Sequence, residues 1–325
     1  MTSLALIEAA AKRLQGHALR TPLLSSPFLD DIAGRRLLVK AECLQHTGSF
    51  KFRGGWAAVS ALAPELRQRG VVAFSSGNHA QGVAMAARAH GAPAVIVMPA
   101  DAPRLKIDNT RALGAEVVLY DRAGGEDRAA VTAPLVADRG LTLIKPFDDP
   151  EVIAGQGTTG LEIAEQAAEQ NVSQADVLVC CGGGGLTSGI ALALEGHAPG
   201  LRVRPAEPQG FDDVARSLKS GEVETNAAPS GSICDAILTP SPGELTWPLL
   251  TRLCGPGITI TDDEALQAMA LAFQRLKIVV EPGGAAALAA ALFHPQDIEG
   301  DAVIAVATGG NVDHDMFARA LNRSL

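Results

Sequence analysis

The sequence of 325 residues has few aromatic side chains and no long run of basic residues. Aromatic residues make up 4% of the chain, whereas hydrophobic residues make up 47% and glycines number 34. This composition indicates a compact α/β protein and excludes a disordered, collagen-like or coiled-coil chain. Because the formal net charge is −9, neither nucleic acid nor an anionic membrane is an expected partner. The length favours two domains.

The sequence also lacks a C-x-x-C pair. Its cysteines are odd in number, which excludes a complete disulfide framework and indicates a reducing, cytoplasmic setting; they are Cys43, Cys180, Cys181, Cys234 and Cys254. The N-terminal segment has no uninterrupted apolar stretch, so we predict no signal peptide. The uncharged run 177–194 is long enough to cross a bilayer, but four consecutive glycines within it favour a strand, a loop and a helix.

Short β-rich runs alternate with helical patterns along the chain. The first set begins at Val71, Ala94, Glu116 and Leu141, and the intervening helices are expected to end at Gly91, Gly114 and Gly140. A second set of strands begins at Val177, Leu201 and Ala302. Apolar strands separated by helices predict parallel sheets, here two with a cleft between them. The stretch 211–257, rich in Pro, Ser, Gly and Thr, predicts an irregular surface.

A run of four glycines, residues 182–185, follows one of these predicted strands and precedes a helix. The carboxyl end of a strand is where ligands bind in open α/β sheets. Without Cβ atoms, backbone N–H groups can approach a phosphate closely, and the helix dipole favours the negative charge. The run matches neither the dinucleotide nor the Walker pattern. We predict a phosphate-binding loop; the alternative is a flexible linker.

Three further segments carry polar groups of chemical interest. SSGNH, residues 75–79, is suited to bind a carboxylate at a helix start, with ordinary helix capping as the alternative. TGGN, residues 308–311, follows the last predicted strand and is alternatively a simple turn. Lys51 stands between Phe50 and Phe52; such a lysine is usually solvated, but burial would lower its pKa and allow attack on a carbonyl.

Together these segments suit a ligand with a phosphate, an aldehyde and a heteroaromatic ring, as in pyridoxal 5'-phosphate. The motifs SFKFRG, SSGNH, AGQGT and GGGG occur in this order, and through them the chain resembles fold-type II pyridoxal-phosphate enzymes of the threonine/serine dehydratase and serine racemase family. The resemblance implies an α/β fold with two open twisted-sheet domains, like the tryptophan synthase β-subunit. Residues 1–64 and 147–325 would form the large cofactor-binding domain, and residues 65–146 the small one.

The resemblance also implies a role for each matching residue. Lys51 matches the Schiff-base lysine and Phe50 the residue beside the cofactor phosphate. Other expected cofactor contacts are Asn78 with the ring hydroxyl, Thr308 with the pyridine nitrogen, and the phosphate loop of Gly182, Gly183, Gly184, Gly185 and Leu186. The substrate is expected to meet Ser75, Ser76, Asn78 and the segment beginning at Gly155.

The implied activity is that of an ammonia-lyase, or dehydratase, in which Lys51 removes the Cα proton. A β-hydroxy amino acid such as L-threonine or L-serine would give a 2-oxo acid and ammonia by α,β-elimination. Racemisation is an alternative, because Ser76 would act on the opposite face of the substrate. Three further alternatives are a 3-hydroxyaspartate dehydratase or racemase, an enzyme that catalyses β-replacement like cysteine synthase, and a cofactor-binding protein without catalytic activity. Arg53, Arg104 and Arg111 are candidates for a second carboxylate, although surface or structural ion pairs fit them better.

Glu207, Asp213 and the main-chain carbonyl of Phe211 resemble the divalent-cation site of this family. Hard oxygen ligands suit Mg²⁺, Ca²⁺ or Mn²⁺, and two solvated carboxylates are the alternative. Pro205 departs from the usual pattern, since proline removes a ladder hydrogen bond from a strand. Glu281 resembles a carboxylate near the active site, or is a helix N-terminal charge. The resemblance further suggests a homodimer.

Overall fold

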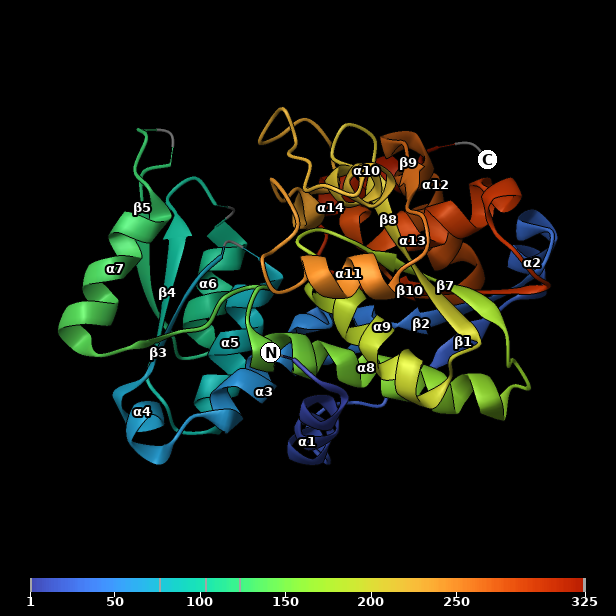
Figure 1. Cartoon of the computed structure of the whole chain (residues 1–325). Helices are drawn as coiled ribbons and strands as arrows, with labels where there is room; N and C mark the ends of the chain where they lie inside the picture. The colour runs from blue at the N-terminus through green and yellow to red at the C-terminus, as the bar shows by residue number, and fades with distance from the viewer. Residues whose placement is uncertain (1, 76, 103, 123, 324–325) are drawn as a thin grey trace.

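The structure is a computed structural model that describes residues 2–75, 77–102, 104–122 and 124–323. Over these residues, ten strands form two separate sheets. Figure 1 shows the smaller sheet on the left and the larger one on the right, with α3 and α5 between them. The expected α/β architecture with two open sheets is confirmed.

The smaller sheet is parallel, with strand order β5-β4-β3-β6. Its strands are those expected from the apolar runs: β3 (Val71–Phe74), β4 (Ala94–Pro99), β5 (Glu116–Tyr120) and β6 (Thr142–Leu143). The helices that accompany it are α4 (Pro64–Arg69), α5 (Asn78–Ala89), α6 (Arg104–Ala112) and α7 (Arg128–Arg139). Gly91, Gly114 and Gly140 follow α5, α6 and α7 with φ of 63°, 92° and 63°, as a left-handed helix end requires.

The larger sheet has the order β1-β2-β10-β7-β8-β9 and is parallel except for β1 against β2. Its strands are β1 (Leu23–Ser25), β2 (Arg36–Ala41), β7 (Ala175–Cys180), β8 (Leu201–Pro208), β9 (Ile258–Ile260) and β10 (Ala302–Ala307). The long helices beside it are α8 (Pro150–Glu169), α9 (Gly185–His197) and α13 (Pro282–Phe293). The segment 177–194 forms strand, loop and helix as predicted, and no helix in the described part of the chain is long and apolar enough to cross a membrane.

The remaining elements pack around the larger sheet and its long helices, and α3 also packs against the smaller sheet. They are α1 (Leu4–Leu14), α2 (Pro27–Ala33), α3 (Lys51–Ala61), α10 (Asp213–Ser220), α11 (Trp247–Leu253), α12 (Asp262–Leu271) and α14 (His314–Leu321), with short turns of helix at η1 (Glu42–Leu44), η2 (His46–Gly48), η3 (Asp235–Ile237), η4 (Ala272–Leu276) and η5 (Pro295–Asp297). Alanine-rich α13 is buried from Pro282 to Leu292, against β7, β8, β10 and α12. Its small side chains allow close packing on the sheet.

Two expectations from the sequence need correction. The stretch 211–257 is not wholly irregular, because it contains α10 and α11, whose short amphipathic patterns were hidden among turn-forming residues. The strands β1, β2 and β9 were not predicted at all. The domain boundaries stay a proposal, since α3 precedes residue 65 yet packs against both α5 and α8, with Phe52 and Trp56 in the core of the smaller sheet.

Candidate active site

A cleft of about 300 Å³ opens between the two sheets, at the carboxyl ends of their strands. It brings together most of the predicted site residues from four separate segments of the chain. Those lining it are Phe50, Lys51, Ser75, Asn78, Gly182, Gly183, Gly184, Gly185, Leu186 and Thr308. Ser76, the proposed residue for racemisation, lies outside the described residues.

A wider hollow of about 650 Å³ lies at the opposite, amino ends of the strands of the larger sheet. Its principal buried charge, Asp176, accepts hydrogen bonds from Arg202 at 2.7 Å and from Arg204 at 3.0 Å. These guanidinium groups lower the pKa of Asp176 although burial alone would raise it. Since this buried charge is satisfied by its neighbours, the cleft rather than the hollow is the candidate site.

Lys51 is the first residue of α3, and its amine faces the cleft. The Nζ atom donates a 2.7 Å hydrogen bond to the main-chain carbonyl of Pro146 and lies 5.1 Å from the centre of the Phe50 ring. Loss of hydration lowers the pKa of this amine to about 8, because the charged form is poorly solvated there. A sizeable fraction of the amine is therefore neutral, and nucleophilic, near physiological pH.

The four glycines connect β7 to α9 and wrap around Phe147. A Cβ atom on Gly183 would lie 2.3 Å from the Phe147 ring, and Gly184 has φ of 89°, so glycine is required at both positions. Gly184 caps α9 without any side-chain hydrogen bond, which leaves N–H groups of the first helical turn open to a ligand. Thr187 adds a buried hydroxyl with no hydrogen-bond partner among the described residues. The loop thus fits a phosphate.

Asn78 begins α5 and joins the smaller sheet to the larger one. Its amide nitrogen donates to Glu281 at 2.6 Å, and its oxygen accepts from Asn311 at 2.7 Å. Burial raises the pKa of Glu281 to about 7. Ser75 accepts a hydrogen bond from the Gly77 N–H, and neither it nor Asn78 caps α5 through its side chain. The helix start therefore remains available for an anionic group.

Thr308 follows β10 and ties the lysine segment to the larger sheet. Its carbonyl accepts a 3.1 Å hydrogen bond from the Phe50 N–H, and Ser49 forms a β-bridge with Gly309. The Thr308 side chain is buried in the cleft wall and interacts with the Cys180 thiol. At the end of β10, the cleft is therefore lined by a neutral polar group, the hydroxyl of Thr308.

Besides Thr187, three cleft residues for which no individual role was expected carry buried polar atoms without partners among the described residues. They are Gln156 with both amide atoms, Thr239 with its hydroxyl and His79 with Nδ1. Burial and the nearby Lys51 lower the pKa of His79 to about 3, so its imidazole is neutral. Such atoms need partners, which a polar ligand in the cleft would supply. Gln156 stands in the AGQGT motif, whereas Thr239 lies in the stretch without a sequence signal.

Gly155 is the exception among the predicted substrate contacts. It does not line the described cleft; a Cβ atom there would lie 2.5 Å from the Arg53 carbonyl and 2.8 Å from the Gly54 Cα. Its place is the tight crossing of α8 with α3. Successive residues of a helix point about 100° apart, so Gly155 and Gln156 face different neighbours, and the latter reaches the cleft.

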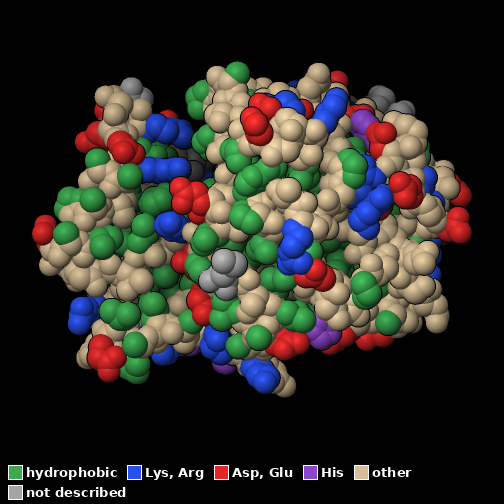
Figure 2. Space-filling model, viewed as in Figure 1, with side chains coloured by type: hydrophobic (Ala, Val, Ile, Leu, Met, Phe, Trp, Pro, Cys, Tyr) green, Lys and Arg blue, Asp and Glu red, His purple; other side chains and the backbone are tan. Residues whose placement is uncertain are grey.

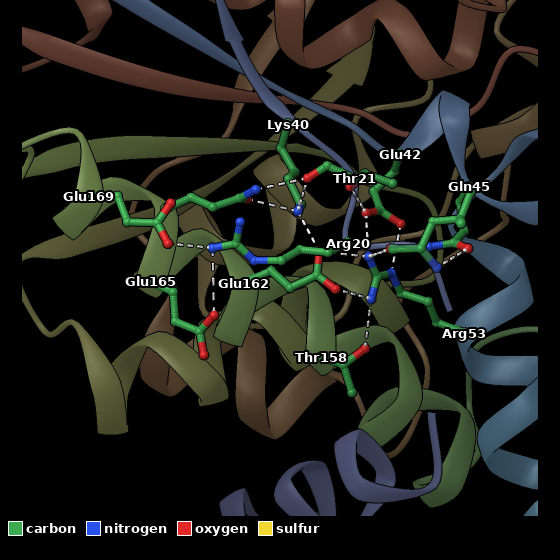
Figure 3. Close-up of polar contacts among 12 residues, drawn as sticks. Arg20, Thr21, Lys40, Glu42, Gln45, Arg53, Thr158, Glu162, Glu165 and Glu169 are labelled. Atoms are coloured by element: carbon green, nitrogen blue, oxygen red, sulfur yellow. Dashed lines mark hydrogen bonds and ion pairs between the residues drawn. The ribbon is translucent and has the colours of Figure 1, made fainter. Parts of the chain in front are cut away.

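Arg53 lies two residues after Lys51 and anchors α3 to its surroundings (Figure 3). Its guanidinium donates to Glu42 at 2.8 Å and to Glu162 at 2.7 Å, and Glu162 also accepts from Lys40 at 2.5 Å. Burial alone would raise the pKa of Glu42, but the two cations lower it overall. Arg53 thus forms structural ion pairs. They fix the position of α3, the helix that begins at Lys51.

The expected cation ligands lie away from the cleft, where β8 ends and α10 begins. Glu207 accepts from the N–H groups of Val214 at 3.0 Å and Ala215 at 2.7 Å. Asp213 accepts from Asn226 at 2.6 Å through Oδ1, while its buried Oδ2 has no described partner. Burial and the neighbouring Asp213 raise the pKa of Glu207 well above its usual value.

No cluster of three or more His, Cys, Asp or Glu side chains in the described chain is arranged to hold a metal. The two buried carboxylates nevertheless fit a hard cation, which would relieve their repulsion and supply the partner that Oδ2 lacks. Pro205 does not interrupt β8, because pairing with β9 begins only at the following residue, Ala206.

Comparison with known proteins identifies relatives that match nearly the whole chain. Residues 14–309 match the family described as pyridoxal-phosphate dependent enzyme. The chain is 42% identical to an L-threo-3-hydroxyaspartate ammonia-lyase of Pseudomonas sp, with 96% of both proteins covered. It is 39% identical to the serine racemase of Arabidopsis thaliana, covering 94% of this chain and 92% of the relative.

Solved structures of similar proteins also match nearly the whole chain. Maize serine racemase superposes with a TM-score of 0.90 at 36% identity, covering 98% of this chain and 97% of that one. The serine racemase of Dictyostelium discoideum gives a TM-score of 0.87 at 37% identity, covering 96% and 99%.

Proposed function

The chain belongs to the family of pyridoxal-phosphate dependent enzymes, and we propose that it is an ammonia-lyase that converts a β-hydroxy amino acid to a 2-oxo acid and ammonia. The observation that carries this proposal is the poorly hydrated Lys51 amine in a cleft that it shares with the four-glycine loop. Relatives named as ammonia-lyases of L-threo-3-hydroxyaspartate and of L-threonine support the reaction type.

Four groups of the cleft would hold pyridoxal phosphate. The N–H groups of the loop 182–185 would bind its phosphate, and Lys51 its aldehyde carbon. Thr308 is suited to the pyridine nitrogen and Asn78 to the ring hydroxyl. When bound, the cofactor supplies an electron sink for the carbanion at the substrate Cα.

The chain itself supplies orientation and proton transfer. Ser75 and the N-terminus of α5 would bind the substrate α-carboxylate. The Lys51 amine, held by Pro146 and partly neutral, would remove the Cα proton as a general base. Neutral Thr308 places no full negative charge beside the pyridine nitrogen, and this favours loss of the β-hydroxyl over transamination.

A second activity, racemisation, is favoured by the relatives named as serine racemases. It would require Ser76 to exchange a proton on the face of the substrate opposite Lys51. Chiral chromatography of L-serine incubations tests it, because D-serine must accumulate before the substrate is consumed. A β-replacement reaction is the remoter alternative, and an assay with sulfide detects it.

We also propose that Glu207, Asp213 and the Phe211 carbonyl bind Mg²⁺, Ca²⁺ or Mn²⁺ in a structural role. The unpartnered, buried Asp213 Oδ2 supports a cation at this place. Because these residues lie outside the cleft, the ion would stabilise the junction of β8 and α10 without touching the substrate.

A homodimer is proposed from exposed apolar side chains around α2 and η4. Phe28 is 57% exposed and Phe273 41%, and Arg275 covers the Phe28 ring at 4.6 Å. Phe273 also contacts Phe317, with ring centres 5.5 Å apart. Large apolar side chains that are this exposed favour a protein partner, here a second copy. We further propose a cytoplasmic location, which the five free cysteines support.

The principal test measures ammonia and 2-oxo acid release by the holoenzyme over L- and D-serine, threonine and 3-hydroxyaspartate. Equal amounts of both products from at least one β-hydroxy amino acid are expected. A yellow holoprotein that releases neither product from any of them would overturn the proposed lyase activity.

A further inference from the structure

One wall of the cleft is formed by a segment to which the chemistry described above gives no task. This segment, residues 238–246, connects η3 to α11 and is called the strap below. Its residues Leu238, Thr239 and Pro240 line the cleft. The Oγ1 atom of Thr239 is shielded from solvent and has no hydrogen-bond partner among the residues that the structure describes. A buried hydroxyl of this kind needs a partner, which a ligand in the cleft would supply.

The strap lies directly on the four-glycine loop. The carbonyl of Gly183 accepts hydrogen bonds from the Thr246 hydroxyl at 2.7 Å and from the Gly243 N–H at 3.2 Å. Near the start of the strap, a Cβ atom on Gly182 would lie 3.2 Å from Thr239 Oγ1. Because glycine has no such atom, no side chain separates this hydroxyl from the loop. Thr239 is therefore beside the first residue of the loop that is expected to bind phosphate.

The two threonines of the strap use their hydroxyls differently. Thr246 is fully buried, and its Oγ1 atom accepts from the Gly243 N–H at 2.9 Å while it donates to the Gly183 carbonyl. These bonds hold the strap against the loop. The Thr239 hydroxyl makes no such bond within the described chain. Of the two, Thr239 thus keeps its donor available for a ligand.

Asn226 fixes the main chain of the strap at Thr239 and Pro240. Its Nδ2 atom donates to the Thr239 carbonyl at 2.7 Å and to Asp213 Oδ1 at 2.6 Å, and its main-chain N–H donates to the Pro240 carbonyl at 2.8 Å. Its Oδ1 atom accepts from Arg216 at 2.8 Å. Since both amide protons and the amide oxygen are engaged, the side chain has one orientation and determines where Thr239 stands.

The distribution of charge in the cleft makes a neutral donor at this place important. Besides Lys51, whose amine is assigned to the aldehyde, the cations that line the described cleft come from α6 and α7 beside the smaller sheet. The wall on the larger sheet contributes two carboxyl groups, Asp235 and Glu281. Figure 2 shows mainly hydrophobic and uncharged surface along the larger-lobe side of the hollow between the lobes. A phosphate on this side therefore depends on N–H and O–H donors.

We propose that the Thr239 hydroxyl donates a hydrogen bond to the cofactor phosphate, and that Asn226 is a positioning residue that holds Thr239 for this contact. The inference rests on the proposed cofactor site and is independent of which amino acid is the substrate. Each phosphate oxygen accepts more than one hydrogen bond, so the hydroxyl adds to the N–H groups of the loop and does not replace them.

The test measures the dissociation constant of pyridoxal phosphate by fluorescence titration in Thr239→Val, Thr239→Ser and Thr251→Val. Valine keeps the shape of threonine and removes the hydroxyl, so affinity should fall about 10- to 100-fold, whereas serine should retain most of it. Thr251→Val is the matched control, because that exposed hydroxyl donates to the Trp247 carbonyl within α11 and does not line the cleft. Phosphorus NMR should show a displaced resonance of the bound phosphate in Thr239→Val. Unchanged affinity in that variant would overturn the proposal.

Pyridoxal, which lacks the phosphate, identifies the group that the hydroxyl meets. Thr239→Val should bind pyridoxal as tightly as the unaltered protein does, and inorganic phosphate should compete less well for its cofactor-free form. Equal losses for pyridoxal and pyridoxal phosphate would place the hydroxyl on another part of the cofactor. A change confined to KM for the amino acid would place it on the substrate. Either result would overturn the proposal.

A double-mutant cycle tests the role of Asn226. Asn226→Ala should weaken binding of pyridoxal phosphate in the unaltered protein but have little further effect in Thr239→Val, because it acts through that hydroxyl. Losses that add in full would overturn the positioning role. None of these measurements requires turnover. A protein whose affinity for the cofactor depends on Thr239, but which releases ammonia from no β-hydroxy amino acid, would contradict the lyase proposal alone.

Discussion

The amine of Lys51 donates a 2.7 Å hydrogen bond to the main-chain carbonyl of Pro146. The next residue, Phe147, is the one around which Gly183 and Gly185 fold. A single short segment therefore contacts both the reactive amine and the phosphate loop, although 95 residues of sequence separate Lys51 from Pro146. This segment connects β6 to α8. The distance between the Lys51 amine and the phosphate loop therefore depends on how the two domains are joined.

Replacing Lys51 with alanine should abolish both turnover and the visible absorbance of bound cofactor. The amine is the expected attachment point and base, so we expect activity to fall by at least about a thousandfold. Absorbance spectra and ammonia release measure the two effects. Lys145→Ala is the control, because that exposed lysine does not line the cleft. An unchanged spectrum in Lys51→Ala would remove the assignment.

Attachment of the cofactor to the cofactor-free protein should accelerate as pH rises through about 8, the lowered pKa of the Lys51 amine. Below this value the amine is mostly protonated and cannot attack an aldehyde; above it the neutral form predominates. Stopped-flow absorbance after mixing with pyridoxal phosphate measures this rate. A midpoint near 10.5, the value of a hydrated lysine, would show that the amine is not shielded from water.

Gly183→Ala should weaken cofactor binding by at least about tenfold, since the added Cβ would lie 2.3 Å from the Phe147 ring and displace the loop. The dissociation constant of pyridoxal phosphate, measured by fluorescence titration, reports the change. Removing the obstructing ring in a Gly183→Ala/Phe147→Ala double variant should restore part of the affinity. Absence of any loss in the single variant would argue against the loop as the phosphate site.

Arg53→Met should lower the free energy of unfolding by about 3–5 kcal/mol, because it leaves the fully buried Glu42 without its ion-pair partner and Glu162 with Lys40 alone. Urea unfolding followed by circular dichroism measures it. Arg20→Met is a matched control, since Arg20 pairs with Glu165 and Glu169 at the surface and should cost no more than about 1 kcal/mol. Similar losses in the two variants would contradict the structural role of the buried cluster.

Millimolar Mg²⁺ or Ca²⁺ should raise the melting temperature, and chelation should lower it. Binding to the folded state at about 100 times the dissociation constant contributes about 2.7 kcal/mol. Asp213→Asn should remove the response to the metal, whereas Asp212→Asn, which alters a carboxylate paired with Arg216, should retain it. A metal response of equal size in Asp213→Asn would place the ion elsewhere.

Much of the fold followed from local patterns. The apolar runs at Val71 and Ala94 predicted β3 and β4, and the glycines that end α5, α6 and α7 have the expected left-handed conformation. The short strands β1 and β9 escaped prediction because three residues carry too little periodicity to be distinguished from loop. α10 and α11 escaped because their surroundings are rich in turn-forming residues.

Short stretches of sequence were enough to predict the role of the glycine loop, the role of the lysine between two phenylalanines, and the alternation of strands and helices. Such features are local: glycines lack a Cβ atom wherever they stand, and apolar runs must be buried. Three outcomes became visible only in the folded chain: Gln156 rather than Gly155 faces the cleft, Glu42 and Glu162 are the ion-pair partners of Arg53, and Lys106 and Arg128 line the cleft on the side of the smaller sheet. They depend on which helix face meets which neighbour, and long-range packing sets that contact.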